Sequence, residues 1–151
     1  MMMSFEKHLL PEGISTMRVE HLGVAVADLD QALETYASLF GYRLLRGPFD
    51  DPTQEATVAF IGSGEPDDVL FELIAPLGEN SHVARTLAKG VSAYHVCYEV
   101  EDIEATLETF KSKGSIVISK PVPAVAYEGR RIAWVMTPTR QITEFVEKTA
   151  P

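Results

Sequence analysis

An internal repeat constrains this chain more than any other feature. Residues 19–29 read VEHLGVAVADL and residues 93–103 read AYHVCYEVEDI, with the histidine, a valine and the aspartate in register. The similarity continues from LETYAS at residues 33–38 to LETFKS at residues 107–112. Self-similarity of this kind indicates a duplicated supersecondary unit. His21 and His95 are therefore equivalent points of two half-domains and candidates for one shared site.

The composition is that of one globular domain with a substantial core. The chain has 151 residues, of which 46% are hydrophobic. Its formal net charge of -9 argues against nucleic acid or an anionic membrane as a main partner, because both attract clustered lysine and arginine. No apolar run is long enough to span a bilayer, and residues 1–17 read as a flexible N-terminal tail without a signal-peptide pattern. The single cysteine, Cys97, cannot form an internal disulfide, and we expect a cytoplasmic protein.

The first module is expected at residues 18–77. A strand at about 18–26 alternates, so His21 and Gly23 share one face and Leu22 and Val24 the other. Asp28 has the position of a helix N-cap. The apolar stripe of the following helix comprises Leu29, Leu33, Tyr36 and Phe40. Further strands are expected at about 42–46, 55–61 and 69–75, with a turn-rich segment at 48–53.

The second module is expected at residues 92–148 and repeats this order. A connector at 78–91, with a short helix, joins the two modules. The strand of His95 leads to a helix closed by Gly114, and a strand at 115–119 precedes a proline-containing loop at 120–129. Two strands, at about 130–137 and 141–147, complete the unit. The predicted fold is therefore α+β, with two tandem βαβββ modules.

Two glutamates occupy matching places in the last strand of each module. Glu72 lies within VLFELIA and Glu144 within ITEFV, each about fifty residues after its histidine. A lone carboxylate in an apolar strand is costly to bury unless it is paired or binds a metal. Taken singly, each residue has a simpler explanation, such as a hydrogen-bonded core histidine or an edge-strand charge. Taken together, His21, Glu72, His95 and Glu144 predict a site for one divalent first-row ion such as Co, Ni, Zn or Mn.

These motifs resemble the vicinal oxygen chelate superfamily, and within it the methylmalonyl-CoA epimerases and glyoxalase I enzymes. The resemblance covers about residues 18–148 and is most specific in HLGVAV at 21–26, ELIAPL at 72–77 and YHV at 94–96. It implies that the paired modules form a cupped mixed sheet around one metal ion, which chelates vicinal oxygens of the substrate or of an enolate formed from it. It carries the metal ligands over to His21, His95 and Glu144. The fourth ligand is glutamine in familiar epimerases and glutamate in glyoxalase I, and here it is Glu72.

Two departures from the epimerase pattern bear on the identity of the substrate. Aligning the DPTQ segment at 51–54 places Val58 where those enzymes carry a second catalytic glutamate, and Glu55 lies three residues away on the other strand face. The turn at 137–141 is also shorter than the usual glycine-containing loop. Both differences weaken an assignment to methylmalonyl-CoA itself.

Five further residues have weaker signals. His82, at the start of the connector helix, is expected to be solvated. Tyr127, Arg130 and Arg131 follow the loop near one mouth of the expected cleft, where an arginine could bind an anionic substrate or simply face solvent at a strand end. Trp134 is expected in the core or the cleft wall.

The resulting expectation is a metal-dependent enzyme that transfers an α-proton of a small acyl thioester or of a 2-oxo or 2-hydroxy acid. Glu144, and secondly Glu72, would take and return the proton while the metal polarises a carbonyl. The alternatives are a glyoxalase I-type lyase acting on a hemithioacetal and a metal-free binding module of the bleomycin-resistance type. An extradiol dioxygenase is less attractive because of the extra glutamate. A homodimer is expected, because pairing covers exposed strand edges.

Overall fold

Each half of the repeat folds into a strand, a helix and three further strands in the computed structural model, which describes residues 16–149. The first half comprises β1 (Arg18–Ala25), α2 (Leu29–Phe40), β2 (Arg43–Asp51), β3 (Ala56–Gly62) and β4 (Leu70–Pro76). The connector contains α3 (His82–Ala88). The second half comprises β5 (Ala93–Val100), α4 (Ile103–Ser112), β6 (Ile116–Pro123), the 3-10 turn η1 (Val125–Tyr127), β7 (Arg131–Met136) and β8 (Ile142–Glu147). The tail expected at 1–17 lies outside the described residues except for its last two.

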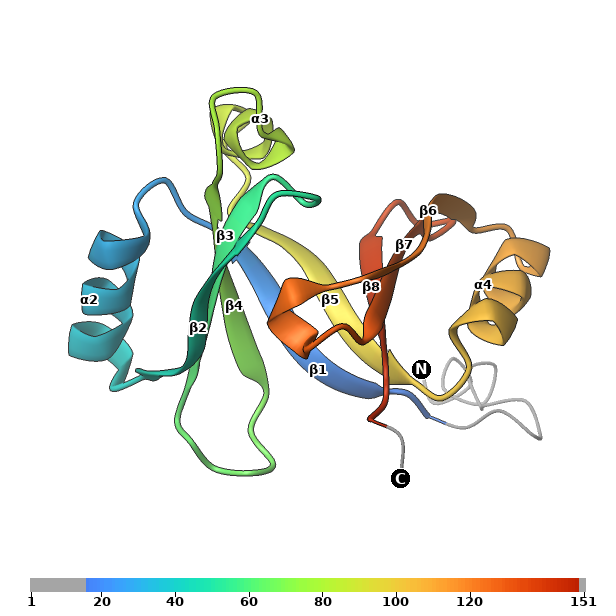
Figure 1. The fold of residues 1–151 in the computed structure, drawn as a ribbon, viewed down its shortest axis with the longest axis horizontal. Coiled ribbons are helices and arrows are strands. Elements are labelled where there is room, and N and C mark those ends of the chain that lie inside the picture. Colours follow the sequence, from blue (N-terminus) through green and yellow to red (C-terminus); the bar gives the residue numbers. More distant parts are fainter. Residues whose placement is uncertain (1–15, 150–151) are drawn as a thin grey trace, which may run out of the picture.

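All eight strands form one mixed sheet in the order β2-β3-β4-β1-β5-β8-β7-β6. β1 runs parallel to β4, and its counterpart β5 runs parallel to β8. The two halves meet where β1 and β5 pair antiparallel. Figure 1 shows the sheet curling, with α2 and α4 at its opposite ends. The predicted α+β fold of two βαβββ units is confirmed, and the two units of one chain pair with each other.

The two helices of the repeat begin in the same way. The Asp28 carboxylate accepts a hydrogen bond from the Gln31 backbone, and the Asp102 carboxylate accepts one from the Ala105 backbone. Each aspartate therefore satisfies an otherwise unpaired N–H of a first helical turn. Gly41 ends α2 with φ 72°, a left-handed conformation that glycine adopts without strain.

The two edge strands are longer than predicted. β2 continues to Asp51, through the expected turn at 48–53, and β6 continues to Pro123, into the expected loop at 120–129. These strand ends contain Pro48 and Pro121, and proline cannot donate a ladder hydrogen bond. At the edge of a sheet that donor is dispensable on the open side. Shifts in the pairing register of both strands also accommodate the prolines.

The outer face of the sheet packs against α2 and α4, and the inner face forms a separate core. Val100, Ile103 and Phe145 belong to the cluster beneath α4, where the rings of Phe110 and Phe145 meet at 4.8 Å. Phe40 was expected on the buried stripe of α2 but is 61% exposed, and its ring lies beside those of Tyr36 and Tyr42. Within residues 16–149, no helix has both the length and the apolar character needed to cross a membrane.

Truncation of Phe145 tests the core beneath α4. Phe145 is fully buried, so Phe145→Ala should lower the free energy of unfolding by about 3–5 kcal/mol through lost burial and the cavity left behind. Leu39→Ala, at a position that is 70% exposed, should change it by less than about 0.5 kcal/mol. Denaturant titration followed by Trp134 fluorescence measures both values. Equal effects of the two variants would contradict this packing.

Candidate metal centre

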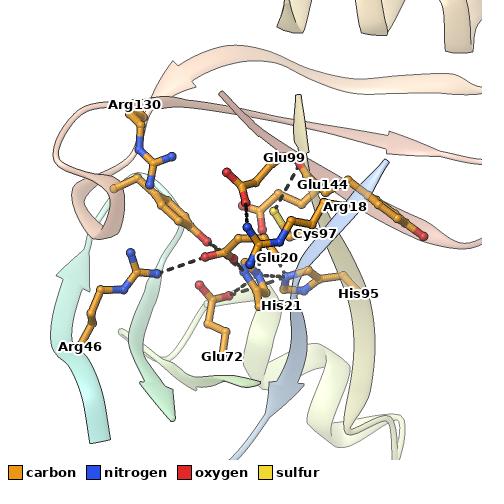
Figure 2. Close-up of polar contacts among 12 residues, drawn as sticks. Arg18, Glu20, His21, Arg46, Glu72, His95, Cys97, Glu99, Arg130 and Glu144 are labelled. Atoms are coloured by element: carbon orange, nitrogen blue, oxygen red, sulfur yellow. Dashed lines mark hydrogen bonds and ion pairs between the residues drawn. The ribbon is translucent and has the colours of Figure 1, made fainter. Parts of the chain in front are cut away.

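The four predicted ligands come from the four central strands and meet at the junction of the two halves. His21 lies on β1, Glu72 on β4, His95 on β5 and Glu144 on β8, and all four are buried. Figure 2 shows their side chains directed toward one another. One ligand atom from each residue lies within 4.8 Å of all the others.

The strand register explains this convergence. Gly23 of β1 stands between His95 on β5 and Glu72 on β4. Cys97 of β5 stands between His21 on β1 and Glu144 on β8. The repeat makes Gly23 and Cys97 equivalent, each two residues after its histidine. Two adjacent rows across the sheet therefore each present one imidazole and one carboxylate, separated by a small residue.

Gly23 provides the space that the His95 ring occupies. A Cβ atom at this position would overlap the imidazole, with its Nε2 only 2.7 Å away. The rings of Tyr94 and Trp134 also contact His95 edge-on, each with a centroid separation of 4.7 Å. On its Nδ1 side the His95 ring is therefore held by packing, since this nitrogen is buried without a hydrogen bond among the described residues.

The separations between the donor atoms fit a metal ion. The Nε2 atoms of His21 and His95 are 3.0 Å apart, and Glu144 Oε1 lies 3.1 and 3.3 Å from them. Glu72 Oε1 lies 3.6 Å from each. Ligands at about 2.0–2.2 Å from an octahedral ion are about 3 Å apart. Glu144 Oε1 is moreover buried with no hydrogen bond among residues 16–149, an arrangement that a bound cation would satisfy.

The electrostatics of the cluster are strongly uneven. Burial lowers the pKa of His21, but the neighbouring carboxylates, Glu72 first, outweigh it and raise this pKa to about 10. Burial also lowers the pKa of His95. Burial raises the pKa of Glu72, whereas for Glu144 the adjacent histidines overcome burial and lower the pKa. A divalent cation among these groups would compensate both carboxylates at once.

Glu20 and Tyr127 belong to the centre although the sequence did not indicate it. The Glu20 carboxylate accepts a hydrogen bond from His21 Nδ1 and another from the Tyr127 hydroxyl at 2.9 Å. The same hydroxyl lies 2.9 Å from His21 Nδ1. Tyr127 is 2% exposed and lines the cavity, in keeping with its expected place near the cleft. Arg46 lies 3.3 Å from Glu20 and adds a positive charge to this side of the cluster.

The two arginines after the loop are engaged in structural contacts. Arg131 forms ion pairs with Glu104 and Glu147, and neither it nor Arg130 lines the cavity at the centre. Arg130 donates a hydrogen bond to the Glu147 carbonyl at 2.8 Å. The explanation as strand-end residues is therefore the one that fits both.

A cavity opens over the two glutamates. The volume open to the centre of a water-sized sphere is about 40 Å³, and the space between atoms, open solvent at the mouth included, is about 420 Å³. Its apolar wall comprises Ala56, Val58, Ile74, Ala124, Ala126 and Ile132, and its other lining residues are Asp51, Gln54, Glu72, His82, Tyr94, Tyr127, Trp134 and Glu144. Trp134 has the expected place in the wall, whereas His82 lines the cavity rather than being fully solvated.

Asp51 is the third carboxylate in the lining, but it is remote from the cluster. Glu72 pairs with Phe60 on β3, whereas Asp51 pairs with Ala56, four positions further along the same strand. At the usual rise per residue this separates the two pairings by about 13 Å along β3. Val58 lies between them on the cavity wall. Of the three carboxylates that line the cavity, Glu72 and Glu144 are therefore the two that belong to the four-ligand cluster.

Comparisons with known proteins agree with this geometry. The family model of the Glyoxalase/Bleomycin resistance protein/Dioxygenase superfamily matches residues 20–134. An ethylmalonyl-CoA/methylmalonyl-CoA epimerase from Cereibacter sphaeroides is 33% identical over 120 residues, covering 78% of this chain and 87% of that protein. A probable lactoylglutathione lyase from Vibrio cholerae is 32% identical over 135 residues, covering 89% of this chain and 93% of that protein.

A solved structure extends the similarity to the whole fold. It is a variant of Streptomyces coelicolor methylmalonyl-CoA epimerase in complex with 2-nitronate-propionyl-CoA. The two chains are 26% identical with a TM-score of 0.75, and the match covers 90% of this chain and all of the other. The similarities thus include two kinds of enzyme.

Substitution of Gly23 tests whether the space beside His95 is needed for metal binding. Gly23→Ala should displace the imidazole and remove most of the bound metal, while the circular dichroism spectrum remains that of the folded protein. Gly62→Ala is the matched control, because its added Cβ would meet Leu45 Cδ1 at 3.4 Å and Leu70 Cδ2 at 3.6 Å, both ordinary contact distances. Elemental analysis of both proteins gives the result. Full metal content in Gly23→Ala would show that His95 does not contribute a ligand.

Proposed function

The chain belongs to the glyoxalase/bleomycin resistance protein/dioxygenase superfamily, and on this premise we propose that it is a metal-dependent epimerase or isomerase. It would transfer the proton next to a carbonyl in a small acyl thioester or in a 2-oxo or 2-hydroxy acid. The observation that carries this proposal is the pair of buried carboxylates, Glu72 and Glu144, which lie beside both imidazoles and line one cavity. Related epimerases act on acyl-CoA thioesters, as their names state.

His21, Glu72, His95 and Glu144 would hold one divalent ion, with Co, Ni, Zn and Mn all compatible with two imidazoles and two carboxylates. Such an ion supplies a Lewis acid that polarises the substrate carbonyl and makes the neighbouring proton more acidic. The protein supplies the rest: two rigid rows of ligands on paired strands and a largely apolar wall that limits access of water.

The two glutamates would move the proton. Glu144 is the first candidate for taking it and Glu72 for returning it, because they enter the cluster from β8 and β4, on opposite sides of the central strand pair. Removal of a proton by one carboxylate and its return by another would invert the configuration at the carbon between them. Val58 leaves no further carboxylate beside the cluster on the β3 wall.

A glyoxalase I-type lyase is the second candidate function. The glutamate at position 72, in place of the glutamine of familiar epimerases, and the similarity to a lactoylglutathione lyase both favour it. Its reaction also moves a proton at the carbon next to an oxygen, here in a hemithioacetal. The same two carboxylates would therefore serve, and the substrate would distinguish the two enzymes.

Solvent hydrogen exchange tests the proton transfer. In D₂O, the metal-loaded protein should exchange the α-hydrogen of methylmalonyl-CoA or of another acyl-CoA thioester, and the metal-free protein should not. Glu144→Gln should reduce the rate about 10²–10⁴-fold, the usual contribution of a general base. Glu147→Gln is the control, because this residue lies on the same strand but pairs with Arg131.

The outcomes separate the candidates. Turnover of the methylglyoxal–glutathione hemithioacetal without thioester exchange would favour the lyase. Exchange without metal, or full activity of Glu144→Gln, would refute the proton-transfer proposal. A protein that binds a ligand but exchanges none of the substrates would instead match a binding module of the bleomycin-resistance type.

We also propose that the chain forms a homodimer. An open groove runs along the outer face of the central strands, lined in part by Leu22, Phe71, Val96 and Tyr98. α2 and α4 cover the two ends of the sheet rather than this middle part (Figure 1). Pairing with a second copy would bury this apolar surface.

Sedimentation equilibrium tests the dimer directly. At micromolar concentration the molecular mass should be twice the 16.6 kDa of the chain. Tyr98→Glu, which places a charge in the groove, should shift the equilibrium toward the monomer. A stable wild-type monomer at this concentration would contradict the proposal.

A further inference from the structure

Two β-bulges, one in each half of the repeat, precede the two histidines of the centre. Along the β1–β5 ladder, Val19 pairs with Tyr98 and His21 with Cys97, so Glu20 is an extra residue in β1. Further along, Gly23 pairs with His95 and Val24 with Ala93, so Tyr94 is an extra residue in β5. Each bulge lies immediately before a histidine.

A bulge changes which way its residue points. In regular strands, neighbouring side chains point to opposite faces, and Glu20 would face away from His21. The extra residue bends the strand and redirects the side chain. Glu20 consequently reaches His21 Nδ1, and Tyr94 lines the cavity beside His95. Equivalent bulges thus place different side chains around the two imidazoles.

We propose that Glu20 is a positioning residue that orients His21 for metal binding. Its carboxylate accepts a hydrogen bond from Nδ1–H, which leaves the lone pair of Nε2 available to a metal ion. Nε2 lies 3.0 Å from His95 Nε2 and 3.1 Å from Glu144 Oε1. A hydrogen bond on the outer nitrogen fixes the tautomer and rotation of a metal-binding imidazole and increases its basicity. This role rests on the metal site of the proposed function.

Two contacts hold the Glu20 carboxylate in place, besides its bond to His21. The Tyr127 hydroxyl donates to its Oε2 at 2.9 Å, and Arg46 Nη2 lies 3.3 Å from its Oε1. The Arg46 guanidinium stacks over the rings of Phe60 and Tyr127, at 4.2 and 5.2 Å. Figure 2 shows Arg46 and Glu20 on the side of His21 away from His95. The carboxylate is therefore both charge-compensated and fixed, as orientation of a ligand requires.

His95 provides the internal contrast. Its Nδ1 is buried with no hydrogen bond among residues 16–149, because Tyr94 at the equivalent bulge offers an aromatic ring there. Only one of the two imidazoles is therefore oriented by a carboxylate. Loss of Glu20 should affect His21 alone.

Zinc titration of the full chain, by competition with a chromophoric chelator, tests this role. Glu20→Ala should bind Zn²⁺ about 10–100-fold more weakly, the usual effect of removing such a partner. Glu20→Gln should recover part of the affinity, because its amide oxygen still accepts the Nδ1 proton. Glu99→Gln is the matched control: this half-buried glutamate on the neighbouring strand pairs with Arg18 and should leave the affinity unchanged.

A spectroscopic measurement distinguishes orientation from general stability. In long-range ¹H–¹⁵N spectra of the zinc-loaded wild type, His21 should show a metal-bound Nε2 and a strongly hydrogen-bonded Nδ1–H. In Glu20→Ala that proton signal should move or broaden, while the His95 signals stay in place. If Glu20→Ala fails to fold, Tyr127→Phe replaces it, with a smaller loss of affinity and a shifted His21 Nδ1–H signal expected.

Three results would overturn the inference. The first is a Glu20→Ala protein whose zinc affinity is within twofold of the wild type and whose His21 signals are unchanged. The second is an equal loss of zinc affinity in Glu99→Gln, which would show that removing a negative charge, rather than the hydrogen bond to His21, weakens binding. The third is Tyr127→Phe with the zinc affinity and the His21 signals of the wild type, in the case where this variant replaces Glu20→Ala. A wild type that binds no zinc would instead refute the metal centre of the proposed function. Weaker zinc binding in Glu20→Ala without any substrate exchange would support the positioning role while leaving the reaction unproved.

Discussion

Two carboxylates and two imidazoles, buried together at the middle of a continuous sheet, impose the main constraint on this structure. Burying such groups without compensation is unfavourable, and the desolvation cost of each is offset only by the other three or by a cation. The cluster is rigid because its four members stand on four adjacent strands. A change in the register of any one strand by a single residue would turn its ligand to the opposite face. The ladder and the site therefore depend on each other.

The antiparallel pairing of β1 and β5 converts a tandem repeat into a two-sided site. Each half contributes one histidine from its first strand and one glutamate from its last, and each last strand lies parallel to its own first strand. When the two first strands pair, the rows His95–Gly23–Glu72 and His21–Cys97–Glu144 become neighbours. Neither half alone brings both imidazoles together, so the centre exists only where the halves meet.

The repeat in the sequence was enough to predict the fold and the four residues that converge. Alternation placed His21 and Gly23 on one face, and matching positions in the last strands identified Glu72 and Glu144. The same rule of alternation concealed Glu20, because a bulge is invisible in a two-residue period. The sequence placed Tyr127 near the cleft but did not predict its hydrogen bond to Glu20, because it lies in the short turn η1 between strands, where periodicity carries no information about direction. The prolines of β2 and β6 suggested turns because the sequence does not show which strands lie at an edge.

The most informative feature of the site is how its symmetry is broken. Duplication supplies two equivalent bulges, but one carries a carboxylate and the other an aromatic ring. Beside His21, the Glu20 carboxylate is fixed by Tyr127 and Arg46. Beside His95, the rings of Tyr94 and Trp134 contact the imidazole and line the cavity. One half of the centre is therefore built to hold a ligand firmly, and the other contributes walls to the space where a substrate would lie. Two copies of one unit, differing at the residue before each histidine, are sufficient for this division.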